Sequence, residues 1–543
     1  MKTLKYITIL AAAVSLCACD KAFDEVKPQG GTLLASQVQE TNAVLPSRVD
    51  ATITGMYTMT SEPLHVKFSS SRPDNYGFAM MDYSNDMEYA DLVTADSDYN
   101  WFSTCMELSS RNADYANPYV RYKVPYDVIA VCNTIITSYP ADTEDPEILQ
   151  KIAQAKAMRA YCYLRLAPYF QFTYATSADK PCVPLVTEET TDFTNNPRAT
   201  VKQVYEQIVA DLTYAVDNLE GFTRPDKSKI DQSVAYGLRA RAYLEMCEWQ
   251  KAYDDAVAAA AGYTPASLSD VSKPSFKSLE EPNWIWGYDM TADMALTFRY
   301  ATASSWVRSF SAWGYAPACQ VYACCNKLLY DKIPVSDVRK GWWVDENLES
   351  PLLDGLAWPG FTDVANADDG GETKSVYLPY TNVKFGCNTV GTTANDEDWP
   401  YMRVEEMILI QAECQARLGN EGEAKNILGD FIIENRDPSW SWVNNPGQNA
   451  LDKIWFQRRV ELWGEGFANS DCRRYQKPMV RFHKGQPSNV PDNFRFNLTA
   501  DDGWWLLRFC TDELNTNKGI VDNTDGTSPV LDQNGELRDG VTD

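Results

Sequence analysis

The stretch DQSVAYGLRARAYLEMCEW (231–249), followed at once by QKAYDDAVAAAAGY (250–263), decides the fold. In both stretches apolar residues return at every third or fourth position, which is the spacing of an amphipathic α-helix. Alanine and tyrosine fill the positions where two such helices would touch. We therefore predict a pair of packed helices here.

The same period recurs on both sides of this pair, at 126–139, 148–170, 200–219, 401–420 and 421–436. Helix pairs of this length are typical of tetratricopeptide-type units, of which we expect about four. The helices carry no aligned catalytic groups, so we interpret them as a scaffold. The prediction is an all-α dominated fold. Its tetratricopeptide-like helix-pair scaffold lies at about 120–263 and 401–475, and about 40–119 and 264–400 form an irregular, loop-rich capping subdomain.

The N-terminus, MKTLKYITILAAAVSLCACDKAFDE, has the features of an export signal. Two lysines precede an apolar run at 6–16 that is too short to span a bilayer, which favours a signal peptide over a membrane anchor. Leu16-Cys17-Ala18-Cys19 resembles the bacterial lipobox. We expect residues 1–18 to be removed and Cys19 to carry lipid. The acidic residues at 20–25 resemble the surface-export signal of lipoproteins in the Bacteroidota.

The composition restricts the classes of ligand. The chain has 75 acidic and 49 basic residues, a net charge of −26, which argues against nucleic acid and anionic lipid surfaces as partners. With only two histidines, His65 and His483, a His base or a His-rich metal site is disfavoured. Among the 14 cysteines there is no CxxC pair with zinc spacing, and the disulfide pattern stays open. Three cysteines sit inside helical patterns and are predicted to be buried thiols: Cys162, Cys247 and Cys414.

Motifs for cofactors and metals give no positive signal. Residues 90–100, ADLVTADSDYN, space carboxylates two apart but lack the glycine and the final glutamate of a calcium loop. The phosphate-binding, nucleophile-elbow and zinc-protease motifs are missing from the sequence. We therefore predict a protein that is not an enzyme and has no cofactor or metal, with an incidental calcium ion left open.

The stretch QRRVELWGEGFANSDCRRY (457–475) interleaves charges of both signs with aromatic residues. Opposite charges at helical spacing predict an ion-pair network that pins the C-terminal helices. The charged members are Arg458, Arg459, Glu461, Glu465, Asp471, Arg473 and Arg474. A catalytic pair of Glu461 and Glu465, as in glycosidases, is the alternative. It is disfavoured because the arginines would keep both acids ionised.

Two segments, 68–105 and 283–315, break the helical period and are rich in aromatic, Asp, Asn and Ser residues. The chain has 16 Trp and 30 Tyr, more than a helical scaffold needs. Sugars offer weakly apolar C–H faces and a rim of hydroxyls, so a sugar site combines aromatic rings with polar side chains. Trp284 and Trp286 are spaced like strand residues beside Gly287, and we expect them to pack in the interior.

Five segments, in the same order along the chain, resemble the SusD/RagB family of outer-membrane nutrient-binding lipoproteins. They are RAYCYLRLAPYF (159–170), RATVKQVYEQIVADLTYAVDNL (198–219), AYGLRARAYLEMCEWQKAYDDA (235–256), MRVEEMILIQAECQARLGN (402–420) and QRRVELWGEGFANSDCRRY (457–475). Together with the lipobox they are spread over most of the length of the chain, up to residue 475. The resemblance makes 19–543 one SusD-like domain.

The resemblance implies a glycan site on the capping subdomain. By that analogy Trp101 is the stacking ring, with Arg72, Asp74, Asn75 and Asn100 as polar partners. Further stacking rings are Tyr76, Tyr99, Trp306, Trp313 and Tyr315.

The implied function is capture of oligosaccharide at the cell surface by a lipoprotein anchored in the outer membrane. The ligand would pass to a TonB-dependent SusC-like transporter. Three alternatives stay open: a RagB-like peptide binder with the same kind of partner, a surface glycoside hydrolase, and a structural adaptor that uses the helix repeats for protein contacts.

Overall fold

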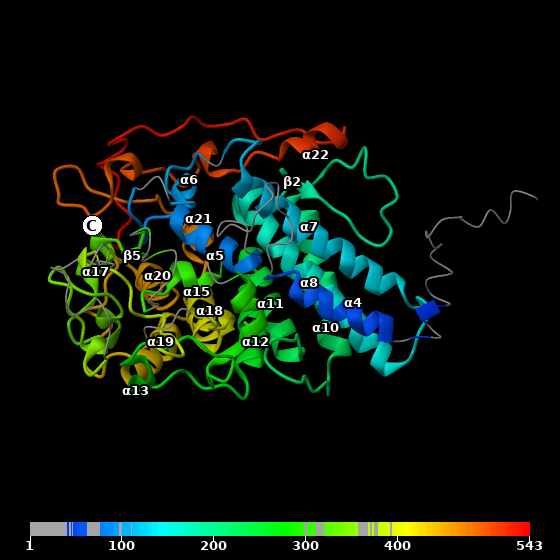
Figure 1. The fold of residues 1–543 in the computed structure, drawn as a ribbon, viewed down its shortest axis with the longest axis horizontal. Coiled ribbons are helices and arrows are strands. Elements are labelled where there is room, and N and C mark those ends of the chain that lie inside the picture. Colours follow the sequence, from blue (N-terminus) through cyan, green and yellow to red (C-terminus); the bar gives the residue numbers. More distant parts are fainter. Residues whose placement is uncertain are drawn as a thin grey trace, which may run out of the picture.

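The computed structural model describes residues 41–42, 45, 47–61, 77–96, 100–109, 111–298, 302–310, 316, 319, 321–356, 368–369, 372–373, 378–390 and 394–543. Helices dominate this part of the chain, as predicted (Figure 1). The longer ones are α4 (Ser47–Thr58), α5 (Gly77–Glu88), α7 (Ala116–Thr137), α8 (Pro146–Phe170), α10 (Val201–Asn218), α11 (Gln232–Glu245), α12 (Trp249–Ala260), α18 (Val404–Arg417), α19 (Glu421–Asn435) and α20 (Ala450–Glu461).

Shorter elements connect these helices. The short α-helices are α6 (Ser103–Met106), α9 (Tyr174–Ser177), α13 (Leu268–Val271), α14 (Ala292–Phe298), α15 (Ala303–Val307), α17 (Lys327–Lys332), α21 (Ala468–Arg474) and α22 (Thr511–Thr516). The 3₁₀ turns are η2 (Val338–Trp342), η3 (Pro351–Leu353), η4 (Asp492–Phe494) and η5 (Gly503–Trp505). The strands pair in twos: β1 (Leu92–Val93) with β5 (Cys324–Cys325), β2 (Pro181–Pro184) with β3 (Arg198–Thr200), β4 (Trp284–Tyr288) with β8 (Trp399–Arg403), and β6 (Asp368–Asp369) with β7 (Glu372–Thr373).

The long helices form one continuous array. Each packs on the next in the order α7, α8, α10, α11, α12, α18, and α18 then packs on α19 and α20. Because α12 contacts α18 directly, the array resumes after the intervening residues 261–403. Neighbour-to-neighbour packing of this kind is the arrangement that stacked helix pairs give.

Local signals in the sequence set several helix starts. The Thr200 hydroxyl accepts from the backbone N–H of Gln203, and the Gln203 side chain returns a bond to the Thr200 backbone, which is a complete capping box for α10. Asp145 caps α8 with Pro146 in its first turn, and Asp231 caps α11. These starts lie within two residues of the predicted ones.

Three sequence predictions need correction. The helix expected at 126–139 is α7, which begins at Ala116 and carries Pro125 inside it. The first residues of the segment 401–420 are strand β8, and α18 begins only at Val404. Cys162 and Cys414 are buried thiols as predicted, but Cys247 is half-buried, because it sits at the turn after α11 with a φ of 62°.

One strand pair joins the segment 283–315 to the scaffold. Strand β4 runs antiparallel to β8, with Trp284 opposite Arg403 and Trp286 opposite Met402. Trp284 and Trp286 are 0% and 1% exposed, which confirms the packing role predicted for them. This pair places the beginning of segment 283–315 directly against the start of α18.

The C-terminal residues wrap around the outside of the array (Figure 1, red). The Asn523 amide donates to the carbonyl oxygen of Phe170 at 3.0 Å, at the end of α8. Near the very end, the buried Asp539 pairs with Arg459 of α20 at 2.7 Å. Among the helices of the described residues, none has both the length and the apolar character needed to cross a membrane.

Candidate ligand-binding site

The two aromatic segments singled out in the sequence meet in the structure, because helix α15 packs on α5. The first segment also contacts residues just beyond the second one. Strand β1 pairs with β5, and the Thr94 hydroxyl donates to the carbonyl oxygen of Val321 at 3.1 Å. The described parts of these segments therefore form one region, although 177 residues separate them in the chain.

An aromatic cluster lies beneath this region. The Phe102 ring meets the Tyr83 ring edge-on at 4.9 Å between centroids, and meets the Trp306 ring at 4.6 Å. Phe102 and Trp306 are 1% and 2% exposed. Trp306 was predicted as a stacking ring, but in this conformation its faces are covered by protein, so it packs in the core.

Trp101 differs from its neighbours because its side chain is 38% exposed. The turn that carries it is fixed from both sides. The Asn100 side chain donates to the carbonyl oxygen of Ala95 at 3.0 Å and accepts from the backbone N–H of Phe102 at 3.1 Å. An aromatic ring on a turn anchored in this way loses little freedom when it meets a ligand.

The predicted polar partners have different outcomes. Asn100 is 4% exposed and uses its amide to hold the turn, so it positions Trp101 instead of facing a sugar. Asp96 is exposed on the same loop and accepts a hydrogen bond from Asn493 of η4. Sequence reasoning missed Asp96 and Asn493, because Asn493 reaches this loop from almost 400 residues away. The other predicted site residues, Arg72, Asp74, Asn75, Tyr76, Tyr99, Trp313 and Tyr315, lie outside the described residues, as does Cys19.

Apart from the Trp101 turn, a hollow lined by aromatic rings, the aromatic cavity, has a volume of about 140 Å³. Its lining includes Tyr57, Trp286, Tyr288, Tyr401, Ser228, Lys229 and Asp289. The Trp286 indole N–H donates to the carbonyl oxygen of Ser228 at 3.1 Å, and the Lys229 ammonium lies 4.5 Å from the centre of the Tyr57 ring. Rings beside charged and hydroxyl groups suit a small polar ligand with apolar faces. Tyr57 and Lys229 could not be chosen from sequence, since Tyr57 lies on α4 and Lys229 on the connection between α10 and α11, far apart in the chain.

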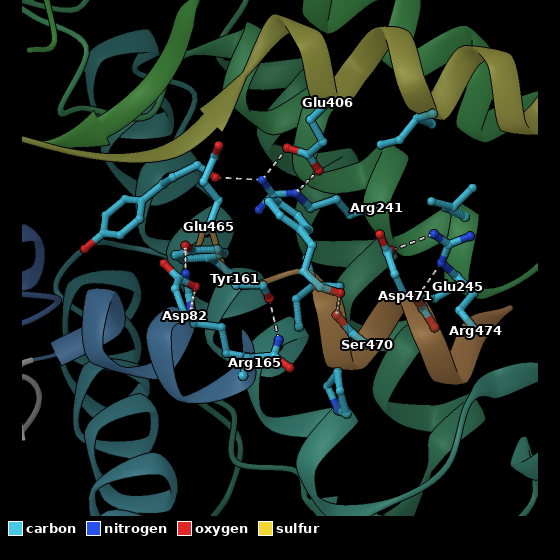
Figure 2. A pocket seen from close by; sticks show the side chains of 18 of the residues that line it. Asp82, Tyr161, Arg165, Arg241, Glu245, Glu406, Glu465, Ser470, Asp471 and Arg474 are labelled. Atoms are coloured by element: carbon cyan, nitrogen blue, oxygen red, sulfur yellow. Dashed lines mark hydrogen bonds and ion pairs between the residues drawn. The ribbon is translucent and has the colours of Figure 1, made fainter. Parts of the chain in front are cut away.

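Another hollow, the charged cavity, has a volume of about 110 Å³ and lies between α5, α8, α11, α18 and residues 465–474 (Figure 2). Arginines and acids point toward one another around it. Arg165 pairs with Asp82 at 2.6 Å, and Arg241 pairs with Glu406 at 2.6 Å. Each acid that lines this cavity has a basic partner, so the cavity is a cross-linked interior of the scaffold.

The network predicted at 457–475 is present beside the charged cavity. Glu461 pairs with Arg436 at 2.8 Å, and with Arg339 and Arg403 at 3.3 Å. Burial alone would raise the pKa of Glu461, but these arginines outweigh it and hold the pKa far below its usual range. Arg403 and Lys384 likewise hold the pKa of Glu465 below its usual value.

Paired acids of this kind do not suit general acid catalysis. A glycosidase needs one carboxyl group that stays protonated near neutral pH, and both Glu461 and Glu465 are kept ionised. We therefore interpret the pair as structural. In the described part of the chain, no group of three or more His, Cys, Asp or Glu side chains is arranged to hold a metal ion, and the cysteines are free thiols.

Comparison with known proteins agrees with this architecture. Residues 37–244 match the SusD-like family described as "Starch-binding associating with outer membrane", and residues 354–534 match the SusD family. The two matches together take in more than half of the chain. The chain belongs to the SusD family. This confirms the family resemblance found in the sequence.

Relatives of this SusD-family chain occur in Bacteroides species. A SusD-like protein of Bacteroides ovatus is 24% identical over 365 residues, and the match covers 62% of each chain. A match of 62% leaves more than a third of that relative outside the comparison.

Two solved structures share the fold. A SusD-like carbohydrate-binding protein from Bacteroides vulgatus is 24% identical with a TM-score of 0.68, over 89% of this chain and 98% of its own. A surface glycan-binding protein A from Bacteroides thetaiotaomicron, solved with laminarihexaose, is 16% identical with a TM-score of 0.63, over 88% of this chain and 99% of its own. These structural matches confirm the predicted fold class.

Proposed function

We propose that this protein is a surface-exposed lipoprotein that binds oligosaccharide and delivers it to a TonB-dependent SusC-like outer-membrane transporter. The observation that carries the proposal is the exposed ring of Trp101 on a turn fixed by Asn100, within a SusD-family fold. Family membership supports the outer membrane as the location. Cys19 is the residue that would carry the lipid.

The binding mechanism follows from the chemistry of the region. A sugar ring would lay its C–H face on the Trp101 indole, and its hydroxyls would bond to polar groups at the rim, of which Asp96 and Asn493 are the described candidates. Such a site changes no covalent bond. The protein would therefore capture and hand over its ligand without turnover.

Related solved structures suggest which glycan to test first. One relative was solved with laminarihexaose, and another is described as a laminarin-binding SusD-like protein. A curved β-glucan chain would offer several sugar faces in succession to a shallow aromatic surface. We include laminarin in the proposal as the first candidate, ahead of α-glucans.

The test is calorimetric titration of the full chain, purified in detergent, with laminarin, laminarihexaose, starch oligosaccharides and peptide pools. We expect saturable binding to one glycan class, weakened at least tenfold, about 1.4 kcal/mol, in Trp101→Ala. Phe193→Ala is the matched control, because Phe193 is an aromatic residue that is 59% exposed on another loop.

Each other outcome has a defined meaning. Glycan binding that is equal in Trp101→Ala and the wild type would keep the function and reject the site. Binding of peptides alone would favour the RagB-like alternative. Release of reducing ends from the glycan would reject a binding protein without turnover. Failure to co-purify a TonB-dependent transporter from native membranes would remove the delivery step.

A further inference from the structure

The ionic groups of the aromatic cavity are arranged differently from those of the charged cavity. Lys229 and Asp289 both line the aromatic cavity. Within the part of the chain that the structure describes, neither side chain forms an ion pair or a hydrogen bond, and the Lys229 ammonium lies against the Tyr57 ring. In the charged cavity, by contrast, each acid has a basic partner.

The two charges of the aromatic cavity are close enough to affect each other. Partial burial and the carboxylate of Asp226 raise the pKa of Asp289, and the Lys229 ammonium opposes them. Asp226 itself is engaged, because it accepts from the backbone N–H of Ser228 at 2.8 Å. Lys229 and Asp289 therefore line one hollow as a neighbouring donor and acceptor that do not satisfy each other.

The aromatic rings offer the cavity mainly apolar surface, because their polar atoms are bonded to the protein. The Tyr57 hydroxyl donates to Gln154 Oε1 at 2.8 Å and accepts from the backbone N–H of Ile230 at 3.0 Å. The Trp286 indole N–H is taken by the carbonyl oxygen of Ser228. A ligand in the cavity would meet ring surface on one side and the two charged side chains on the other.

The volume and charge of the cavity restrict the ligand. A single ordered water needs only about 10–15 Å³, so a hollow of about 140 Å³ has room for a larger molecule. Cavities for drug-sized ligands are larger, which limits this one to a small ligand or to one unit of a chain. One cation and one anion on the wall give no excess charge to attract an ion, so a neutral ligand is favoured.

We propose that the aromatic cavity is a second binding site, which takes a single neutral sugar unit. A hydroxyl group can accept from an ammonium and donate to a carboxylate at the same time, so one sugar hydroxyl bridges Lys229 and Asp289. The C–H face of the sugar lies on the rings. Trp101 and Asn100 do not line this cavity, so the inference goes beyond the proposed function. The unit is either a free hexose or the end of a longer glycan.

The first test observes the cavity directly and needs no variant of its charged residues. Met294 lines the cavity, and its sulfur lies 3.3 Å from the Tyr288 hydroxyl, so its methyl NMR signal reports on this site. The full chain, labelled at the methionine methyl groups, is titrated with glucose, galactose, mannose and laminarihexaose. At least one of these sugars should shift the Met294 signal to saturation. The signal of Met479, which is 0% exposed in another part of the core, should not move.

Variants separate this site from the Trp101 turn. Lys229→Met and Asp289→Asn should each weaken the effect of the sugar on Met294 about tenfold, because each removes one side of the hydroxyl bridge. Lys251→Met, at an exposed lysine of α12, is the matched control and should leave the effect unchanged. Trp101→Ala should leave it unchanged as well.

Each outcome of these titrations has a defined meaning. A shift with a free hexose supports the site and makes the ligand a free sugar, and a shift with laminarihexaose alone supports it and makes the ligand a chain end. No shift of Met294 with any of the sugars would overturn the proposal, as would equal shifts in the wild type and Lys229→Met. Loss of the shift in Trp101→Ala would also overturn it, since one site would then explain both effects. Failure here leaves the proposed function standing, because that function is tested by glycan binding to the whole chain.

Discussion

The C-terminal ion-pair network and the turn that carries Trp101 use polar and aromatic residues in opposite ways. In the network, the carboxylate of Glu461 is 0% exposed and meets three arginines, so its bonding capacity is spent inside the protein. At the turn, the polar group of Asn100 is spent on the backbone, and the ring of Trp101 is left 38% exposed. The network satisfies its hydrogen-bonding groups within the protein, whereas the turn leaves part of an aromatic ring exposed to solvent.

This difference separates structural charge from functional surface. A cluster of acids and arginines resembles an active site, but here the arginines keep Glu461 and Glu465 ionised. The exposed ring of Trp101, by contrast, lies on a turn that the Asn100 side chain holds through two hydrogen bonds. We therefore interpret the ion-pair network as structural, and the turn that carries Trp101 as the candidate binding site.

The largest expected effect is on the network. Glu461→Ala leaves Arg339, Arg403 and Arg436 without the acid that they share, so we expect a loss of about 3–5 kcal/mol in the free energy of unfolding. Urea unfolding of the two proteins measures it. Glu434→Ala on the exposed face of α19 is the control and should change stability by less than about 0.5 kcal/mol. Equal effects of the two variants would show that the network does not stabilise the fold.

The next largest effect concerns the buried tryptophan of the capping segments. Trp306→Ala removes a ring that is 2% exposed and packs on Phe102, so we expect a loss of about 3–5 kcal/mol, while Trp306→Phe should lose less because it keeps an aromatic ring. The same urea experiment measures both. A Trp306→Ala variant with native stability and weakened glycan binding would instead make Trp306 a binding ring, as the sequence predicted.

Acid should weaken the buried ion pairs of Glu88 and Glu413. Despite burial, arginines hold the pKa of Glu88 and of Glu413 at about 2, against 4.5 for a free glutamate. Each carboxylate therefore contributes stability that is complete above about pH 4.5 and is lost as the pH falls toward 2, about 3 kcal/mol for each group. Unfolding measured from pH 6 to pH 2.5 should follow this course. Glu413→Gln should be less stable at pH 6 and have a flatter curve, whereas Glu421→Gln, an exposed site, should follow the wild type.

Local features of the fold were open to prediction from sequence. The capping box of Thr200 and Gln203 and the cap at Asp145 are written within a few consecutive residues, and both helices begin where these signals lie. The ion-pair network was also visible, because its charges share one stretch. What the stretch could not tell is which charge goes unpaired, since Arg458 and Arg474 take Asp471 and leave Arg473 without it.

The division of roles within the candidate site was beyond sequence reasoning. Trp101 and Trp306 both lie in segments that lack helical periodicity, so the sequence does not distinguish them. Only the three-dimensional packing shows that Trp306 is covered, by Phe102. Pairings such as Arg459 with Asp91 join residues 368 apart, which no local pattern encodes. The role of Asn100 did leave a signal, because an asparagine two residues before a buried aromatic often bonds its own turn.

The smallest effect on stability should come from Trp101, and it is the result that most sharpens the comparison. Because its side chain is 38% exposed, Trp101→Ala should cost less than about 1 kcal/mol of the free energy of unfolding, although it removes the same atoms as Trp306→Ala. Trp101→Tyr should restore most of any glycan binding, since it keeps a ring of the same orientation on the same turn. Measured side by side in urea, Trp101→Ala and Trp306→Ala should differ by at least about 2 kcal/mol. If they are equally destabilised, Trp101 is a packing residue, and the turn held by Asn100 carries no free face for a sugar.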